Sequence, residues 1–175
     1  FTNAGGQPAN SIAKWNHTNS NWSAVGAGVN EDIYAMTVHN DTLCVGGYFG
    51  ETDGNPAGSL AYWDGTNWFP LGDGLATDDD YISTLHSHNG TLYAGGYFSE
   101  INGIPAESIA AWDGSEWAPL SMGSAGNVVD ALLKFEDKLL AAGAFAEAGD
   151  LYVGNIALWD GIKWEMVSKG GFFSS

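Results

Sequence analysis

A phenylalanine followed fourteen residues later by a tryptophan occurs four times in this chain, and this spacing constrains the fold more than any other feature. The pairs are Phe1/Trp15, Phe49/Trp63, Phe98/Trp112 and Phe145/Trp159. Successive tryptophans of these pairs lie 48, 49 and 47 residues apart. Such a period indicates one small structural unit that is copied along the chain. We therefore expect the recurring residues to serve architecture, and we look for function where the copies differ.

Each full copy contains four short apolar segments that are separated by turn residues. In the middle copy, segments 82–88 and 91–98 flank Asn89-Gly90, a pair that tolerates the positive φ angles of a tight hairpin. The third segment ends in Trp-Asp-Gly, and we expect Asp-Gly to form a two-residue turn into the fourth segment. No stretch shows sustained helical periodicity. The copy is therefore predicted to be an antiparallel meander of four strands.

A four-stranded meander with large apolar residues on both faces has to stack on copies of itself, and this period is typical of a β-propeller blade. We predict an all-β fold, a β-propeller segment of four-stranded antiparallel blades, with a spiralling solenoid as the alternative. The prediction comprises half a blade (11–25) plus three full blades. The whole chain, 1–175, forms a single segment with repeats at approximately 1–29, 30–77, 78–126 and 127–175.

The first copy begins at its phenylalanine and lacks the two strands that precede this residue in the other copies. Closed propellers need at least about four blades. We therefore expect the ring to be completed by the remainder of a longer propeller or by other copies of the chain. The longer propeller is the preferred interpretation, because two copies would still leave each half-blade without its first two strands.

The charge of the chain is strongly negative, with 21 Asp and Glu against five Lys and no Arg, for a formal net charge of −16. This charge repels phosphate groups, so we expect no nucleic-acid partner. We expect no direct membrane insertion, because no apolar run is long enough to span a bilayer. No charged-then-apolar leader opens the chain, so we expect any export signal to have been removed or to lie outside this sequence. The only cysteine, Cys44, aligns with Tyr93 and Leu140, which predicts a buried strand residue.

The glycine doublet that follows an apolar strand, with two later tryptophans around a turn, resembles the kelch motif. Residues 92–96 (Leu-Tyr-Ala-Gly-Gly) with Trp112 and Trp117 show it best. The added Pro-Ala segment, as in Pro105-Ala106, looks more like the kelch-type repeats of large secreted or surface proteins. These include bacterial extracellular repeat proteins and the fungal cortical polarity-marker propellers. The resemblance covers nearly the whole chain, and it implies an extracellular or cell-surface scaffold or binding module without catalytic residues.

Two other propeller groups share single features with the chain. Galactose oxidase has a copper site on a similar propeller, but no matching ligand set is found here, and we expect no metal site of that kind. The Trp-Asp-Gly-x-x-Trp string is similar to that of some bacterial propeller lectins. This similarity makes a carbohydrate-binding propeller the main alternative function.

Two groups of carboxylates are candidate ligand-binding residues. One group stands two residues after the phenylalanine of each full copy, and it consists of Glu51, Glu100 and Glu147. These residues form a ring along one rim that could bind a cation or a ligand, or they stabilise turns. The second group is Asp78, Asp79 and Asp80 in the loop before a first strand. Clustered carboxylates can hold Ca²⁺, but their spacing here is not that of the known calcium loops, so a solvated acidic loop is the preferred interpretation.

Other polar residues are expected to have structural roles. Asp64, Asp113 and Asp160 precede glycine in the turns, which indicates turn formation and not catalysis. His39 and His88 end the first strands of their copies, and we expect them, with His86, to be surface or hairpin-end residues without a metal.

Four Asn-x-Ser/Thr sequons are possible N-glycosylation sites in a eukaryotic secreted protein. Their asparagines are Asn16, Asn21, Asn40 and Asn89.

The sequence therefore predicts a non-catalytic extracellular scaffold or recognition module that binds a protein or glycan partner. Binding is expected at the loops between blades, where the copies diverge: 26–32, 73–81 and 121–127. Tryptophans exposed in pockets would favour the lectin, and tryptophans sandwiched between blades would favour the scaffold. A third alternative is part of an enzyme whose active site is completed by missing blades.

Overall fold

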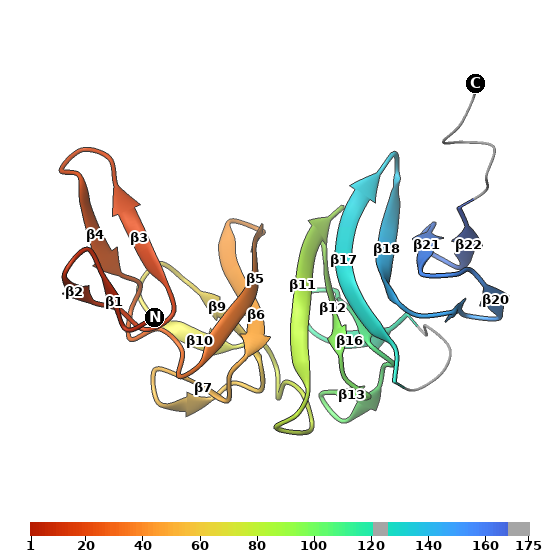
Figure 1. The fold of residues 1–175 in the computed structure, drawn as a ribbon, viewed down its shortest axis with the longest axis horizontal. Coiled ribbons are helices and arrows are strands. Elements are labelled where there is room, and N and C mark those ends of the chain that lie inside the picture. The colour runs from red at the N-terminus through yellow and green to blue at the C-terminus, as the bar shows by residue number, and fades with distance from the viewer. Residues whose placement is uncertain (121–125, 168–175) are drawn as a thin grey trace.

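A computed structural model of the chain describes residues 1–120 and 126–167, and this part contains strands but no helix. Three four-stranded antiparallel sheets follow a two-stranded one in chain order. The sheets stand side by side in an arc whose two ends do not meet (Figure 1). The predicted all-β propeller segment, half a blade plus three blades, is thus confirmed.

We call the four sheets the half-blade and blades 1 to 3. The half-blade consists of β3 (Ala13–Asn16) and β4 (Asn21–Ala24). Blade 1 consists of β5 (Asp32–His39), β6 (Thr42–Tyr48), β9 (Leu60–Trp63) and β10 (Trp68–Pro70). Blade 2 consists of β11 (Tyr81–His88), β12 (Thr91–Tyr97), β15 (Ile109–Trp112) and β16 (Trp117–Pro119). Blade 3 consists of β17 (Val128–Phe135), β18 (Lys138–Ala144), β21 (Ile156–Trp159) and β22 (Trp164–Met166).

A short hairpin precedes the third strand of every copy, where only turn residues were predicted. In the half-blade it is β1 (Asn3–Ala4) with β2 (Gln7–Pro8), and in blade 1 it is β7 (Glu51–Thr52) with β8 (Asn55–Pro56). In blades 2 and 3 it is β13 (Glu100–Ile101) with β14 (Ile104–Pro105), and β19 (Glu147–Ala148) with β20 (Leu151–Tyr152). These hairpins extend the blades beyond the four strands that were predicted.

The two kinds of turn within a blade differ in length. Asn89 and Gly90 form the predicted two-residue turn between β11 and β12, with φ angles of 51° and 77°. The prediction of a two-residue Asp-Gly turn was wrong, because Trp112 pairs directly with Trp117 and leaves four residues between them. The longer loop allows Asp113 to accept two backbone hydrogen bonds from within the loop, at 2.8 and 2.9 Å.

The glycine doublet permits two close approaches that a side chain would block. A Cβ atom on Gly96 would lie 2.0 Å from a backbone oxygen of the adjacent β11. A Cβ atom on Gly95 would lie 2.7 Å from Val129 Cγ1 in the next blade, and one on Gly46 would lie 2.5 Å from Ile82 Cγ2. The first glycine of the doublet therefore sets the distance between blades. In blade 3 this position is occupied by alanine, Ala142.

The tryptophan that begins the fourth strand of each full blade is buried against the preceding sheet. Trp68, Trp117 and Trp164 are only 3%, 2% and 5% exposed. Their Nε1–H groups donate to backbone oxygens at the end of the preceding fourth strand: Trp68 to Val25 at 2.7 Å, Trp117 to Leu71 at 3.2 Å and Trp164 to Leu120 at 2.7 Å. The same contact is therefore made at three successive interfaces.

The hydrophobic core is divided into three clusters, each of which lies between neighbouring sheets. The cluster between blades 1 and 2 includes Leu60 and Leu71 on one side and Ile82 and Phe98 on the other. The first strand of blade 2, β11, lies against the first strands of blades 1 and 3, β5 and β17. Cys44 is 2% exposed in this core, as predicted, and burial raises its pKa to about 11.

Replacing Gly95 by alanine should destabilise the protein, because the new Cβ would collide with the stiff side chain of Val129. We expect a loss of about 1 to 3 kcal/mol in the free energy of unfolding, measured by chemical denaturation. Gly50→Ala is the matched control, since the nearest atom to its Cβ would be 3.9 Å away. Equal losses in the two variants would show that Gly95 does not set the blade distance.

Replacing Trp117 by phenylalanine should remove the hydrogen bond to Leu71 and leave a buried backbone oxygen without its donor. We expect the free energy of unfolding to fall by about 2 kcal/mol. Trp22→Phe is the control, because Trp22 is the corresponding residue of the half-blade and is 41% exposed. A loss in Trp22→Phe as large as in Trp117→Phe would contradict this account.

Candidate binding surface

A cavity of about 540 Å³ lies where the loop before β5 approaches the loop between β10 and β11. We call it the rim cavity. Its lining includes three carboxylates, Glu31, Asp73 and Asp78, together with Asn30 and the ring of Tyr48. No Lys, His or Cys is among the lining residues. Two of the predicted binding loops, 26–32 and 73–81, therefore meet at one acidic concave surface.

Backbone hydrogen bonds hold the walls of the rim cavity. Asn30 Oδ1 accepts hydrogen bonds from the backbone N–H groups of Gly50 at 3.1 Å and Glu51 at 3.0 Å. On the opposite wall, Leu75 N–H donates to the Gly58 oxygen at 2.9 Å. These bonds tie each loop to the short hairpin region of blade 1. These hydrogen bonds therefore hold in place the two loops that carry the carboxylates.

The predicted acidic triplet is divided by the fold. Asp78 lines the rim cavity and Asp79 is exposed, whereas Asp80 is only 6% exposed. Asp80 Oδ2 is buried without a hydrogen-bond partner among the described residues. Burial raises the pKa of Asp80, and the nearby charges of Asp79 and Glu100 add to this effect. The three side chains do not act as one cluster.

The described residues contain no group of three or more His, Cys, Asp or Glu side chains arranged to hold a metal ion. The Ca²⁺ site at residues 78–80 stays a prediction, without such a cluster to support it.

The predicted glutamate ring is distributed over three blades. Its members, each the first residue of a short hairpin, are Glu51 in β7, Glu100 in β13 and Glu147 in β19. None of them lines the rim cavity. Neither Glu31 nor Asp73 was predicted from the sequence to bind a ligand. Both residues become relevant because two loops that are distant in sequence meet in space.

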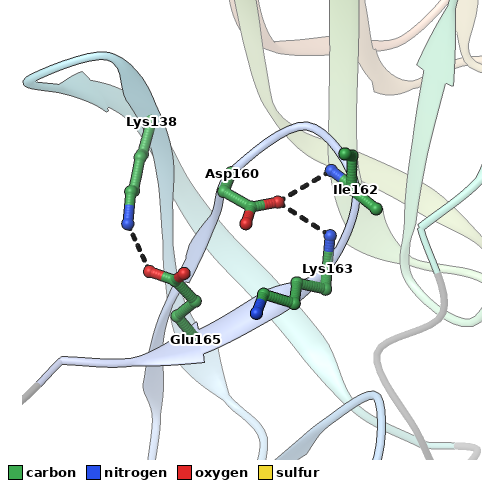
Figure 2. A network of polar contacts seen from close by, with 5 residues as sticks. All are labelled: Lys138, Asp160, Ile162, Lys163 and Glu165. Carbon is green, nitrogen blue, oxygen red and sulfur yellow. Dashed lines mark hydrogen bonds and ion pairs between the residues drawn. The ribbon is translucent and has the colours of Figure 1, made fainter.

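The turn aspartates have the structural role that was predicted. Asp160 Oδ1 accepts hydrogen bonds from the backbone N–H groups of Ile162 at 2.8 Å and Lys163 at 2.9 Å (Figure 2). These bonds lower the pKa of Asp160. Beside this loop, Lys138 Nζ contacts Glu165 Oε2 and links β18 to β22 (Figure 2). Asp64 and Asp113 make the corresponding turn bonds.

The histidines were expected at the surface or at hairpin ends, and His39 differs from this expectation in part. It ends β5 but is only 6% exposed, and its Nδ1 lies 3.0 Å from Ser87 Oγ of blade 2. The Nε2 atoms of His86 and His88 are also buried, without a hydrogen-bond partner among the described residues. Burial lowers the pKa of His39 and His86, and the neighbouring His88 lowers that of His86 further. These side chains belong to the interfaces between blades.

The four sequon asparagines, Asn16, Asn21, Asn40 and Asn89, are all exposed. Asn40 Nδ2 lies 3.1 Å from His39 Nε2, so a glycan there would alter this contact. The third predicted binding loop, 121–127, falls mostly outside the described residues.

No known protein-family model and no curated protein matches the sequence. In residues 1–120 and 126–167, no helix is long and apolar enough to cross a membrane.

Protonation of the buried histidines should destabilise the fold in mild acid. Because the pKa values of His39 and His86 are lowered in the folded chain, the unfolded chain binds protons first. We expect the free energy of unfolding to fall as the pH decreases below about 6.5, toward the lowered pKa values. Chemical denaturation between pH 7.5 and pH 5, values chosen to bracket the ordinary histidine pKa of about 6.5, measures this.

His86→Leu should make that pH dependence less steep, because it removes an imidazole whose pKa is lowered in the folded chain. Leucine is the chosen replacement because Leu133 occupies the corresponding position of blade 3. His17→Gln is the control, because His17 lies exposed in the half-blade turn. An unchanged pH dependence in His86→Leu would rule out His86 as a source of the effect.

Proposed function

We propose that this chain is part of a kelch-like propeller of a secreted or surface protein and that it acts as a non-catalytic recognition scaffold. The rim cavity is its binding surface, and a basic segment of a protein partner is its ligand. The observation that carries this proposal is the convergence of Glu31, Asp73 and Asp78 around one cavity without a lining cation. Lysine and arginine side chains are the protein groups that carboxylates bind most strongly.

The tryptophans that begin the fourth strands of the three full blades support a scaffold over a lectin, whereas Trp15 and Trp22 of the half-blade are 40% and 41% exposed. Trp68, Trp117 and Trp164 are sandwiched between sheets, so their ring faces are not available for stacking on sugars. The aromatic lining of the rim cavity consists of Tyr48 and the buried Phe49. A glycan array tests the lectin directly, and specific glycan binding there would replace the proposal.

The lining of the rim cavity also supports binding over catalysis. Its carboxylates are exposed, and no histidine, cysteine or lysine stands beside them to act as a nucleophile or proton-transfer partner. The proposed role therefore needs only electrostatic attraction and shape.

Removing two carboxylates of the rim cavity should weaken binding of a basic peptide. We expect the double variant Glu31→Gln/Asp78→Asn to bind a fluorescent hexalysine peptide about tenfold more weakly, measured by anisotropy. Binding to the unmodified chain should also weaken when NaCl is raised from about 50 mM to about 300 mM.

Glu116→Gln/Asp150→Asn is the matched control for this experiment. Both residues are exposed and lie outside the rim cavity, and the change in net charge is the same. Equal weakening in the two double variants would show that the peptide responds to overall charge, and the rim cavity would lose its assigned role.

A further inference from the structure

Two cavities lie at equivalent places in successive interfaces between blades. The cavity between blades 1 and 2 has a volume of about 260 Å³, and the cavity between blades 2 and 3 has a volume of about 70 Å³. Five repeat positions line both cavities. Four of them, which are His39, Asn40, Trp112 and Gly114 in the larger cavity, have the same residue 49 or 47 positions later in the smaller one. The fifth position is Cys44 in the larger cavity and Tyr93 in the smaller one, and we name the cavities after these two residues.

The residue at the fifth position accounts for the difference in volume. Tyr93 packs against the core between blades 2 and 3, as does Trp159 of the opposing blade. Cys44 is buried in the core between blades 1 and 2, and its side chain ends in a thiol. The phenol ring of the chain itself therefore occupies space in one interface that stays open in the other.

The neighbouring ring of Tyr62 does not fill the Cys44 cavity. Tyr62 pairs with Cys44 across β6 and β9, at a place where blade 2 has Ala111. Its ring stacks on Phe69, with ring centroids 5.3 Å apart and an interplanar angle of 22°. The Tyr62 ring is therefore held beside the Cys44 cavity and forms one of its walls.

The polar groups of the Cys44 cavity suit a neutral ligand with a hydroxyl group. Among the described residues, no Asp, Glu or Lys lines this cavity. In the next interface, burial raises the pKa of Tyr93, and a side-chain hydrogen bond with Thr91 opposes this shift. Thr42 is the counterpart of Thr91 and lines the Cys44 cavity. The Thr42 hydroxyl donates to the Asn40 oxygen at 3.4 Å, and its own oxygen is an acceptor for a ligand hydroxyl.

We propose that the Cys44 cavity binds a phenol ring, supplied by a free phenolic molecule or by a tyrosine side chain of a partner. The chain provides the model for this ligand, because Tyr93 places a phenol ring at the equivalent position of the next interface. An engineered apolar cavity of about 150 Å³ binds benzene, so a cavity of about 260 Å³ has room for a phenol. Tyr62 and Trp112 give it two aromatic walls, which are favourable neighbours for another ring.

This site is separate from the rim cavity. Residues just before β5, such as Glu31, line the rim cavity, whereas His39 at the end of the same strand lines the Cys44 cavity. The eight residues of β5 lie between them. The phenol site therefore does not rest on the proposed binding of a basic segment, and either proposal can fail without the other.

The probe for this proposal is p-cresol, which is the tyrosine side chain as a free molecule. It is titrated into the full chain, produced in bacteria so that Asn40 carries no glycan, and followed by NMR. We expect the indole signal of Trp112 to shift and that of Trp159 to stay unchanged, because only the larger cavity has room. A Kd of about 1 mM is expected for a ligand of this size.

Exchanging the residue at the fifth position should remove the site from one interface and create it in the other. Cys44→Tyr places a ring in the cavity, and we expect p-cresol to bind at least about tenfold more weakly. Cys44→Leu is the second variant, should tyrosine not be accommodated beside Tyr62, and it should weaken binding at least about threefold; leucine occupies this position in blade 3 as Leu140. Tyr93→Cys should add a second site that shifts the Trp159 signal.

The proposal is overturned if p-cresol does not shift the Trp112 signal of the unmodified chain, or if Cys44→Tyr and Cys44→Leu leave its affinity unchanged. A response to methyl glucoside or methyl galactoside in place of p-cresol would also overturn it and would assign the cavity to a sugar. The tripeptide acetyl-Gly-Tyr-Gly-amide separates the two sources of the ring. Binding of this tripeptide supports a tyrosine of a partner, and binding of p-cresol alone supports a free phenolic molecule.

Discussion

The arrangement of the sheets depends on one repeated contact, the buried indole of each fourth strand against the backbone of the preceding sheet. An indole is large and apolar but carries one donor, so its burial requires an acceptor at a fixed place. The oxygens of Val25, Leu71 and Leu120 provide that acceptor at three interfaces. Each contact holds the fourth strand of one sheet against the backbone of the preceding sheet. The glycine doublet at the inner strands then allows the remaining surfaces to meet.

Most of the architecture could be predicted from the sequence, because the fold is determined by local signals that recur. The turn at Asn89-Gly90 follows from the tolerance of these residues for positive φ. The predicted length of the Asp-Gly turns was wrong. The same dipeptide suits both a two-residue turn and a four-residue loop that is closed by hydrogen bonds to the aspartate. The short hairpins, with strands of two residues, leave too little alternation to be detected. His39 was misjudged in part because burial between sheets depends on the partner blade.

The candidate site was predictable only in outline. The divergent loops 26–32 and 73–81 were identified as binding segments, and the structure brings them together at the rim cavity. Which carboxylates point into that cavity could not be derived, because neighbouring residues of a loop face different surroundings. Asp78 and Asp80 are two residues apart, yet one lines the cavity and the other is buried. Loop conformation depends on distant backbone partners, such as Gly58 for Leu75, which have no signature in the local sequence.

Ala142 makes the free side of blade 3 sterically different from the corresponding sides of blades 1 and 2, which have Gly46 and Gly95 at this position. Gly46 and Gly95 admit a branched side chain from the blade that follows, at distances that leave no space for a methyl group. Ala142 carries that methyl group at the corresponding register position of blade 3. A neighbour on this side must therefore begin its inner strand with a residue smaller than Ile82 or Val129, or sit farther away. An interface on this side of blade 3 would thus have a steric limit that the two interfaces at Gly46 and Gly95 do not have.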